Sequence, residues 1–353
     1  MVVVAKARLL SKREHSSIGP LAAEIIHKAS LDTGEPLPDD PLVSWMGPKS
    51  ANDIRKLERA IQLLLVDHND YQLPSTRKDF NLLSGIGAFL YLGLFRTVRK
   101  LTNRFVASNP TWIKTPRELQ VRLRPHTETI FRVFREQVLA MVDPGQIELF
   151  EKIESSQTTI SIGNSESLPL PEKSVHFSLS SPPYCTRIDY AVATKPELAV
   201  LGYTSVKFRE LRKSLLGTST VPRIASLESG EWGSTCRTFL NTVRNHNSKA
   251  SKSYYYKNHV QYFHGIFNSL RELNRVLTKE GTGVLVVQDS FYKNVKNDLP
   301  EIVVEMASAI GLKLIRRKNF NHSRTMANLN PAVRRYRESF SATESVLVFH
   351  PTR

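Results

Sequence analysis

The spacing of apolar residues predicts helices for the first part of the chain. Between residues 51 and 106, apolar side chains recur every three or four positions, as they do along the buried side of an amphipathic helix. Residues 1–30 follow a similar pattern, and the adjacent Gly19 and Pro20 predict a break between two helices. Residues 31–50 combine prolines, glycines and acids, which predicts a loop. We therefore expect a mainly helical region up to about residue 150.

After residue 150 the pattern changes to short strands that alternate with helices. Residues 158–162 and 175–180 are rich in strand-forming residues, and residues 283–288 are a continuous apolar run typical of a strand buried on both faces. Residues 260–277 predict an amphipathic helix before that run. The remaining predicted elements are a helix and a closing antiparallel strand pair: residues 300–310, 313–319 and 345–349. This alternation predicts an α/β fold whose sheet carries helices on both faces.

Composition adds a basic charge to this picture. The 353 residues include 49 Lys and Arg against 33 Asp and Glu, a net charge of +16, which favours a polyanionic partner and nucleic acid first. The only cysteines, Cys185 and Cys236, form no CxxC pair, so we expect a reducing compartment, no disulfide framework and no structural zinc. The longest apolar stretch, residues 82–95, is too short for a membrane span and predicts a buried helix. We expect a cytoplasmic protein without a membrane partner.

The candidate chemistry lies in the SPPY stretch formed by Ser181, Pro182, Pro183 and Tyr184, directly after the strand predicted at residues 175–180. Prolines cannot donate to a sheet, so the strand must stop there, at the edge where open α/β sheets bind ligands. The Ser181 hydroxyl and the Pro182 carbonyl offer two acceptors beside the Tyr184 ring. Such a set suits the exocyclic amino group of a planar base. The alternative is that the prolines only end a strand.

SPPY, preceded by a strand and by Gly163 and Asn164, resembles the catalytic motif of the amino-methyltransferases that modify cytosine N4 or adenine N6 in DNA. The later run YFHGIFNSLRELNRVLTKEGTGVLVVQD is also similar to that family's pattern of helix, glycine turn and strand, and the match covers about residues 157–349. The resemblance implies a Rossmann-like sheet with a C-terminal antiparallel hairpin, S-adenosylmethionine as cofactor and DNA as partner. It implies that Ser181 to Tyr184 are catalytic, that Gly163 and Asn164 lie at the cofactor, and that cytosine N4 is favoured.

Residues 1–30 resemble the segment that follows the cofactor-binding glycine loop in that family, with Ser17 where an acid would bind the ribose. The glycine-rich run itself, of the type Asp-Pro-Phe-x-Gly-x-Gly, does not occur in the sequence. On this alignment the first strand is missing beside the SPPY strand, which leaves an open sheet edge. A second polypeptide could supply the glycine loop, the recorded start could be too late, or the chain could be an inactive remnant. The expected divisions are residues 1–30, 31–150 and 151–353, with a possible target-recognition insertion at 203–259.

Two further groups of residues are candidates for substrate binding. Arg187, Asp189 and Tyr190 follow SPPY closely enough to line the same pocket; alternatively, an Arg–Asp pair holds the loop. Cys185 has no identifiable base nearby and is expected to be a buried, inert thiol.

Lysines and tyrosines alternate further along the chain, in a pattern suited to tracking phosphates and stacking bases: Lys252, Tyr254, Tyr255, Tyr256 and Lys257. The alternative is a flexible loop whose tyrosines dock on the next helix. Basic residues near the C-terminus are expected to form a rim around the cleft: Arg316, Arg317, Lys318, Arg334, Arg335 and Arg337.

Three functions are consistent with these observations. The first is a DNA amino-methyltransferase, alone or as the catalytic-motif half of a split enzyme. The second is a noncatalytic nucleic-acid-binding subunit or degenerate methyltransferase. The third is an RNA base methyltransferase, because the same chemistry serves any base amino group.

Overall fold

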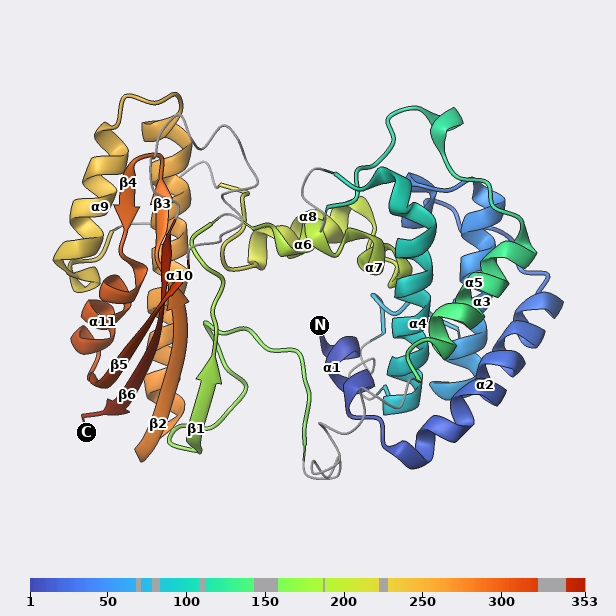
Figure 1. The fold of residues 1–353 in the computed structure, drawn as a ribbon, viewed down its shortest axis with the longest axis horizontal. Coiled ribbons are helices and arrows are strands. Elements are labelled where there is room, and N and C mark those ends of the chain that lie inside the picture. Colours follow the sequence, from blue (N-terminus) through green and yellow to red (C-terminus); the bar gives the residue numbers. More distant parts are fainter. Residues whose placement is uncertain are drawn as a thin grey trace. The chain divides into compact units, whose positions relative to one another are not determined.

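The computed structural model describes residues 1–67, 71–77, 83–107, 112–142, 158–186, 188–221, 228–322 and 341–352. The chain forms two compact units, each with its own hydrophobic core (Figure 1). The first, called here the helical unit, comprises residues 1–162 and 191–211, and the second, the sheet unit, comprises residues 163–190 and 212–353. The division falls near residue 162 instead of 150, and residues 191–211 join the helical unit.

Helices make up the regular structure of the helical unit. They are α1 (Val2–Arg8), α2 (Lys12–Leu31), α3 (Pro48–Leu65), α4 (Gly85–Thr102), α5 (Thr127–Leu139) and α7 (Lys195–Val200). Two more helices, α6 (Tyr190–Ala193) and α8 (Ser205–Ser214), cross the unit boundary, because Tyr190 and residues 212–214 belong to the sheet unit. Short 3-10 turns occur at Pro41–Ser44, Asn103–Phe105 and Leu119–Val121. Helix α4 is central and packs against α1, α3, α5 and α7. It contains residues 85–95 of the apolar stretch predicted to be a buried helix, and Leu90 and Leu94 are fully buried, which confirms the prediction for these residues.

The predicted helix break at Gly19 and Pro20 is wrong. Helix α2 runs through Pro20, and the break lies earlier, where Ser11 and Glu14 form a capping box at the start of α2. A proline inside a helix costs about 3 kcal/mol. Here the apolar stripe of α2 continues across the proline, with the fully buried residues Ile18, Ala22, Ile25 and Ala29. Burial of that stripe in the core offsets the missing hydrogen bond. Because α1 and α2 occupy nearly all of residues 1–30, no strand precedes Ser17.

Close packing of α4 against α5 depends on Gly93. A β-carbon at this position would lie 2.4 Å from Cγ2 of Val138, which no real packing tolerates. We expect Gly93→Ala to destabilise the helical unit by about 1 to 3 kcal/mol through overpacking, and the added change Val138→Ala to restore part of that loss. Urea unfolding followed by far-ultraviolet circular dichroism measures both effects.

Gly85→Ala, at the start of α4, is the matched control for this prediction, because the nearest atom to its new β-carbon, Cδ1 of Leu10, lies at an ordinary contact distance of 3.6 Å. Alanine favours a helix over glycine by about 1 kcal/mol, so this control should be neutral or stabilising. Equal effects of the two substitutions would contradict the packing argument.

The sheet unit contains a mixed four-stranded sheet, so the α/β class is correct. The strands are β1 (Val175–Ser180), β2 (Leu277–Gln288), β5 (Leu312–His322) and β6 (Ala342–Pro351), in the order β1-β2-β6-β5. Strands β1 and β2 are parallel, whereas β6 is antiparallel to both of its neighbours. The closing antiparallel pair predicted from the sequence is confirmed as β5 and β6. Residues 158–162, predicted as a strand, form neither helix nor strand.

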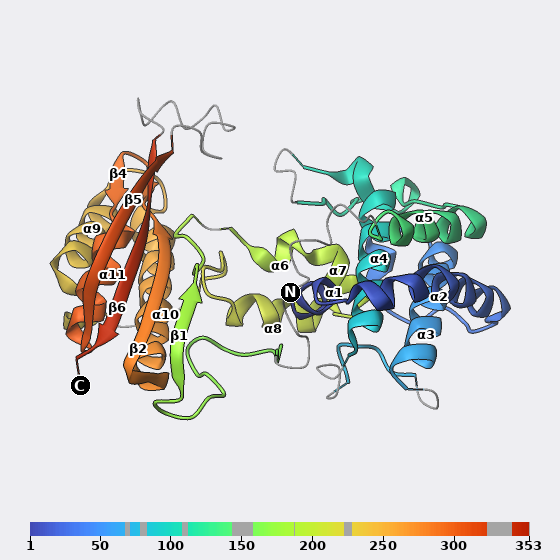
Figure 2. The same cartoon turned by 60° about the horizontal axis from the view of Figure 1, so that its bottom comes forward.

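The helices α9 to α11, described next, lie on one face of this sheet, and among the described residues of the sheet unit no helix covers the other face, in contrast to the prediction of helices on both faces. They are α9 (Gly233–Asn245), α10 (Tyr256–Val276) and α11 (Leu299–Ala309), preceded by a 3-10 turn at Gly230–Trp232 and a π-helical turn at Ser251–Tyr255. A small hairpin, β3 (Ser290–Tyr292) with β4 (Val295–Asn297), follows β2. Figures 1 and 2 show α9, α10 and α11 on the same side of the strands, and the three helices pack against one another. The core of this unit therefore lies between one helical layer and one face of the sheet.

Candidate functional site

Strand β1 ends where the two prolines begin. Its last residue in register is Ser180, which lies beside Leu285 of β2. Beyond it, the exposed Ser181 still contacts β2, because its hydroxyl donates a hydrogen bond of 3.3 Å to the carbonyl oxygen of Val286. With its hydrogen directed to Val286, Oγ of Ser181 presents lone pairs that can accept a hydrogen bond, and the side chain of Tyr184 is a further hydrogen-bonding neighbour of Ser181.

The buried Tyr262 holds the backbone of Pro183 in place. The hydroxyl of Tyr262, on α10, donates a hydrogen bond of 2.6 Å to the carbonyl oxygen of Pro183. Tyr262 is 3% exposed, and its pKa is raised well above the ordinary value by burial, so its hydroxyl stays protonated as a donor. Among the described residues, no hydrogen bond reaches the carbonyl oxygen of Pro182. The loop thus leaves that carbonyl available beside Ser181.

The ring of Tyr184 is held by a carboxylate from β6. Its hydroxyl donates a hydrogen bond of 2.7 Å to Oε2 of Glu344. The register of the sheet places Glu344 opposite Gln288, the last residue of β2, at the same end of the sheet as the SPPY loop. Partial burial and the bond to Glu344 raise the pKa of the Tyr184 phenol. Ser181, Pro182 and Tyr184 are therefore brought together at the carboxyl end of β1.

The link between Tyr184 and Glu344 predicts a measurable change in titration. We expect Glu344→Gln to lower the pKa of Tyr184 toward the ordinary phenol value, because removing the carboxylate charge makes the phenolate less unfavourable. Nuclear magnetic resonance of protein labelled at the tyrosine ζ-carbon resolves this titration. Glu301→Gln is the control: it removes a carboxylate of α11 that pairs with Arg317 of β5, and it should leave the pKa of Tyr184 unchanged. An unchanged pKa in Glu344→Gln would show that the hydrogen bond is not made.

Cys185 is buried, as predicted, but the expectation that no base lies near it is wrong. Its sulfur lies 3.2 Å from Nδ1 of the buried His259, on α10. The ring of His259 packs edge-on against Phe239 and Tyr292, in the core of the sheet unit. Both groups are buried, which matches the expectation of a buried thiol.

Asp189 is buried in an ion pair and does not line an open pocket. Its carboxylate accepts hydrogen bonds of 2.8 and 2.6 Å from Arg212 and one of 3.0 Å from Ser219. The structure thus supports the alternative of an Arg–Asp pair, although the arginine is Arg212 and comes from further along the chain. Tyr190 is 44% exposed, and burial of its remaining surface raises the pKa of its phenol. Arg187 lies outside the described residues, as do Arg334, Arg335 and Arg337.

The tyrosines at 254–256 dock on the protein, and the segment is helical instead of a flexible loop. The hydroxyl of Tyr254 donates a hydrogen bond of 2.9 Å to the carbonyl oxygen of Ser219, and that of Tyr256 donates to Glu228. Tyr255 packs against the rings of Tyr254 and Tyr292 at 5.0 Å. Burial and the bond to Glu228 raise the pKa of Tyr256 to about 12. All three rings are half-buried, whereas Lys252 is exposed and Lys257 is half-buried.

The residues assigned to the cofactor are not brought together within one unit. Gly163 and the exposed Asn164 belong to the sheet unit, where the Asn164 side chain accepts a hydrogen bond of 3.0 Å from the amide of Glu166. Ser17 is exposed in the middle of α2, in the helical unit. Neither unit shows a strand followed by a glycine-rich turn in its described residues. These residues alone therefore do not fit S-adenosylmethionine, because nothing in the described chain would hold its methionine portion.

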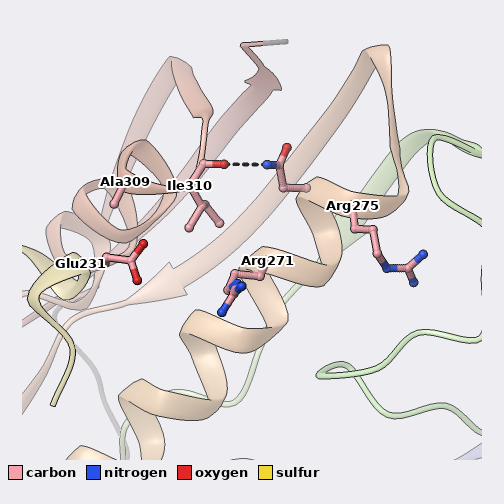
Figure 3. Close-up of a pocket in the computed structure, with 6 residues that line it drawn as sticks. Glu231, Arg271, Arg275, Ala309 and Ile310 are labelled. Carbon is pink, nitrogen blue, oxygen red and sulfur yellow. Dashed lines mark hydrogen bonds between the residues drawn. The ribbon is translucent and has the colours of Figure 1, made fainter. Parts of the chain in front are cut away.

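The hollow in the sheet unit drawn in Figure 3 lies at the opposite end of the sheet from SPPY. It has a volume of about 450 Å³ and is lined by Glu231, Arg271, Asn274, Arg275, Ala309 and Ile310. Asn274 and Arg275 precede Leu277, the first residue of β2, so the hollow lies at the amino end of that strand. The Asn274 amide donates to the carbonyl oxygen of Ile310 at 2.6 Å. Arg275 donates to Glu272 at 2.8 Å, and in Figure 3 its side chain points away from Glu231 and Ala309. This hollow is therefore separate from the candidate site.

Sequence reasoning missed the residues that hold the SPPY loop: Tyr262, Glu344 and Arg212. Tyr262 lies within a predicted amphipathic helix, and no local signal distinguishes it from other core tyrosines. The other two belong to segments distant in sequence, so only the tertiary fold reveals their contacts. Asp289 is a further missed residue, and for this one the sequence did carry a signal. It directly follows the buried strand β2, at the carboxyl edge of the sheet where polar ligand-binding residues gather. Asp289 accepts a hydrogen bond of 2.9 Å from the Thr343 amide and helps to join β2 to β6.

Two structural features are absent from the described residues. No group of three or more metal-ligating side chains gathers among them. In the same part of the chain, no helix has the length and apolar character needed to cross a membrane. A scan against protein-family models, a search of curated proteins and a search of solved structures each return no match to this chain.

Proposed function

We propose that this chain is a DNA amino-methyltransferase, either alone or as the part of a split enzyme that carries the base-binding catalytic motif. The reaction is transfer of a methyl group from S-adenosylmethionine to the exocyclic amino group of a base in DNA, with cytosine N4 favoured over adenine N6. One observation carries the proposal: the exposed Ser181 hydroxyl, the Pro182 carbonyl and the Tyr184 ring lie together at the carboxyl end of β1.

The free hydrogen-bonding positions of this loop are acceptors, which supports an amino group as the ligand. Ser181 donates its hydrogen to Val286, which leaves an acceptor, and the Pro182 carbonyl can only accept. An exocyclic amino group has two hydrogens, so two acceptors can hold it in one orientation. The half-buried Tyr184 ring, fixed by Glu344, supplies a face for stacking against the base.

The architecture of the sheet unit favours the same site. Parallel strands β1 and β2 joined through α10, with the hairpin of β5 and β6 closing the sheet, fit the Rossmann-like methyltransferase sheet implied by the sequence resemblance. In such sheets ligands bind beyond the carboxyl ends of the parallel strands. Ser181 to Tyr184 occupy that position.

Charge supports DNA as the substrate. The chain carries a net charge of +16, and Lys252, Arg316 and Lys318 are exposed in the sheet unit. Such residues bind phosphates without regard to sequence and contribute most of the salt-dependent affinity for DNA. The same groups would attract RNA, so RNA is a competing substrate in the test below.

A second candidate function is a noncatalytic nucleic-acid-binding subunit. The observation that favours it is the lack of fit to S-adenosylmethionine, because Ser17 lies in the middle of a helix and the described residues contain no strand followed by a glycine-rich turn. A subunit of this kind would use the basic surface but would have no need to recognise an amino group.

The experiment compares two DNA duplexes that differ by one amino group. Each carries a single unpaired base, either cytosine or 2-pyrimidinone, which lacks the N4 amino group. We expect the full chain to bind the cytosine duplex about tenfold more tightly, the worth of one or two hydrogen bonds at an enclosed site. Ser181→Ala should reduce this preference while leaving the affinity for the 2-pyrimidinone duplex unchanged.

Further pairs of nucleic-acid ligands, which differ only in one amino group or in sugar type, distinguish cytosine, adenine and RNA as the substrate. A preference for adenine over purine at the unpaired position would assign the adenine N6 reaction, and a preference confined to RNA hairpins would assign an RNA substrate. Equal affinity for both members of every pair would refute recognition of an amino group and leave the noncatalytic subunit. Because no cofactor is added, the result does not depend on where S-adenosylmethionine binds.

A further inference from the structure

Two buried polar residues lie at the base of the small hairpin formed by β3 and β4. Ser290, the first residue of β3, lies opposite Asn297, the last residue of β4. Ser290 is 7% exposed and Asn297 is 0% exposed. A polar side chain buried this deeply destabilises a fold unless hydrogen bonds replace those that it made to water. The hydrogen bonds of these two side chains lead to the SPPY loop.

A chain of two hydrogen bonds runs from Asn297 to the backbone that follows Tyr184. Nδ2 of Asn297 donates to Oγ of Ser290 at 3.0 Å, and Oγ of Ser290 donates to the carbonyl oxygen of Cys185 at 3.2 Å. A carbonyl oxygen can only accept, so the single hydroxyl hydrogen of Ser290 is directed to Cys185. Oγ of Ser290 must then accept from Asn297, which requires the amide nitrogen of Asn297, and not its oxygen, on that side. The polarity of the chain is therefore fixed from one end to the other.

The second polar atom of the Asn297 amide indicates that the donor is what this position requires. Oδ1 of Asn297 is buried and has no hydrogen-bond partner among the described residues. An apolar side chain would avoid an unpaired acceptor, and an aspartate would offer acceptors but no donor. Asparagine supplies the donor for Ser290 without adding a charge, which explains the residue type at this position.

The carbonyl groups of Pro183 and Cys185, on either side of Tyr184, are each held by a buried hydroxyl. Tyr262 donates to the first at 2.6 Å, and Ser290 donates to the second. These bonds restrict the backbone between the two points, and with it the direction of the Tyr184 ring. Such support matters at a binding site, because a displacement of about 1 Å can cost about 100-fold in rate.

The residue before Ser290 connects the same hairpin to the other support of Tyr184. The amide of Asp289 donates to the carbonyl oxygen of Thr343 at 3.0 Å, and Oδ1 of Asp289 accepts from the Thr343 amide at 2.9 Å. Thr343 precedes Glu344, whose carboxylate accepts the hydrogen bond of the Tyr184 hydroxyl. The start of the hairpin thus supports both the backbone after Tyr184 and the carboxylate that holds its ring.

We infer that Ser290 and Asn297 are positioning residues of the SPPY site, with Asn297 acting through Ser290 on the backbone that carries Tyr184. This inference rests on the proposed function, because it concerns recognition of the same base amino group. Both residues are buried in the sheet unit and act on the loop instead of on the ligand. The hairpin of β3 and β4 is therefore part of the site, although it pairs with no described strand of the four-stranded sheet.

Asn297→Asp tests the polarity of the chain. The substitution keeps the shape of the side chain but replaces the amide donor with an acceptor, so the Ser290 hydroxyl turns toward it and releases Cys185. Ser290→Ala removes the bond to Cys185 directly. We expect each variant to reduce the preference for the cytosine duplex over the 2-pyrimidinone duplex from about tenfold to about twofold. Affinity for the 2-pyrimidinone duplex should stay unchanged.

Asn297→Ala is the uncharged companion of Asn297→Asp, and it serves where the buried carboxylate prevents folding. It removes the donor but leaves the Ser290 hydroxyl free to keep its bond to Cys185. We therefore expect an intermediate preference of about fivefold. A loss in Asn297→Ala as large as that in Ser290→Ala would contradict the polarity argument, because it would point to packing instead of to the direction of the hydrogen bonds.

A double variant and a control distinguish positioning from a general loss of stability. Residues that act in series give no further loss when both are changed, so Ser290→Ala combined with Asn297→Asp should match Ser290→Ala alone. Asn274→Asp is the control, because the Asn274 amide also donates to a carbonyl oxygen, that of Ile310, at the opposite end of the sheet. It should keep the tenfold preference. Additive losses in the double variant, or a reduced preference in the control, would overturn the inference.

A spectroscopic signal reports the chain of hydrogen bonds without any DNA. Cys185 and Thr186 form the only Cys-Thr pair in the sequence, because Cys236 is followed by arginine. Protein labelled with ¹³C at the cysteine carbonyl and with ¹⁵N in threonine therefore gives one carbonyl-to-amide correlation, that of Cys185. The carbonyl shift responds to the hydrogen bonds that its oxygen accepts. We expect it to move in the same direction in Ser290→Ala and Asn297→Asp, and to stay in place in the control.

The outcomes separate this inference from the proposed function. A moved Cys185 signal in both variants, with no amino-group preference in the unmodified chain, upholds the support of the loop and refutes the methyltransferase. A tenfold preference that Asn297→Asp leaves intact upholds base recognition and overturns the role of Asn297. A Cys185 signal that moves in Ser290→Ala alone overturns the action of Asn297 through Ser290.

Discussion

Arg55→Met is expected to destabilise the helical unit by about 3 to 5 kcal/mol, the usual loss when one member of a buried ion pair is removed. Arg55 is fully buried on α3 and donates hydrogen bonds of 2.8 and 3.0 Å to the two carboxylate oxygens of Asp40. It also donates to the carbonyl oxygens of Ala199 and Val200, at the end of α7. The substitution leaves the carboxylate of Asp40 and both carbonyls without this donor.

The charge of Arg55 is maintained inside the core by its partners. Burial by itself would lower the pKa of the guanidinium, but the hydrogen bonds and charge of Asp40, with a further contribution from Glu58, raise it above the ordinary value. Glu58 is held in turn by the hydroxyls of Tyr71 and Tyr91, each at 2.6 Å. The network joins α3, α4 and α7, so we expect its loss to loosen the whole unit.

Urea unfolding, followed by hydrogen exchange in α3 and α4, measures the effect of Arg55→Met. Arg132→Met is the control: Arg132 pairs with Glu136 on the surface of α5, and exposed pairs contribute little. Similar losses for the two variants would show that the buried network does not determine the stability of the unit.

Ser181→Ala is expected to lower DNA methylation by about 100-fold or more in the cells that make this protein, where any natural partner is present. The Ser181 hydroxyl is one of the two acceptors proposed to orient the base amino group, and loss of orientation alone costs about this factor. Tyr184→Ala should abolish methylation by removing the stacking ring. Mass spectrometry of genomic nucleosides measures N4-methylcytosine and N6-methyladenine directly.

Two control variants make this prediction specific. Ser253→Ala removes another exposed serine hydroxyl of the sheet unit and should leave methylation unchanged. Tyr184→Phe keeps the ring but removes the hydrogen bond to Glu344, so we expect a smaller loss than for Tyr184→Ala. Unaltered methylated bases in Ser181→Ala cells would refute the proposed function.

The sequence by itself determined features that depend on local pattern and backbone chemistry. The apolar stretch that became α4 and the helical period of α10 are visible in short windows, because helix and strand place side chains with different periods. The end of β1 before Pro182 and Pro183 follows from the missing N–H of proline. The alternating strands and helices of the second part were sufficient to predict an α/β fold and the antiparallel pair of β5 and β6.

Only the tertiary structure decided the features that depend on distant partners. Pro20 remains within α2 because the buried stripe around it finds a core, and no local window contains that information. Residues 283–288 were expected to be buried on both faces of the sheet. Only the side chains on one face are fully buried, since α10 and α11 lie on the same side of the sheet. Sheet register brings Glu344 to Tyr184, and packing pairs Asp189 with Arg212. Local sequence limits which elements form, whereas register and packing free energy, summed over the whole unit, determine which side chains meet.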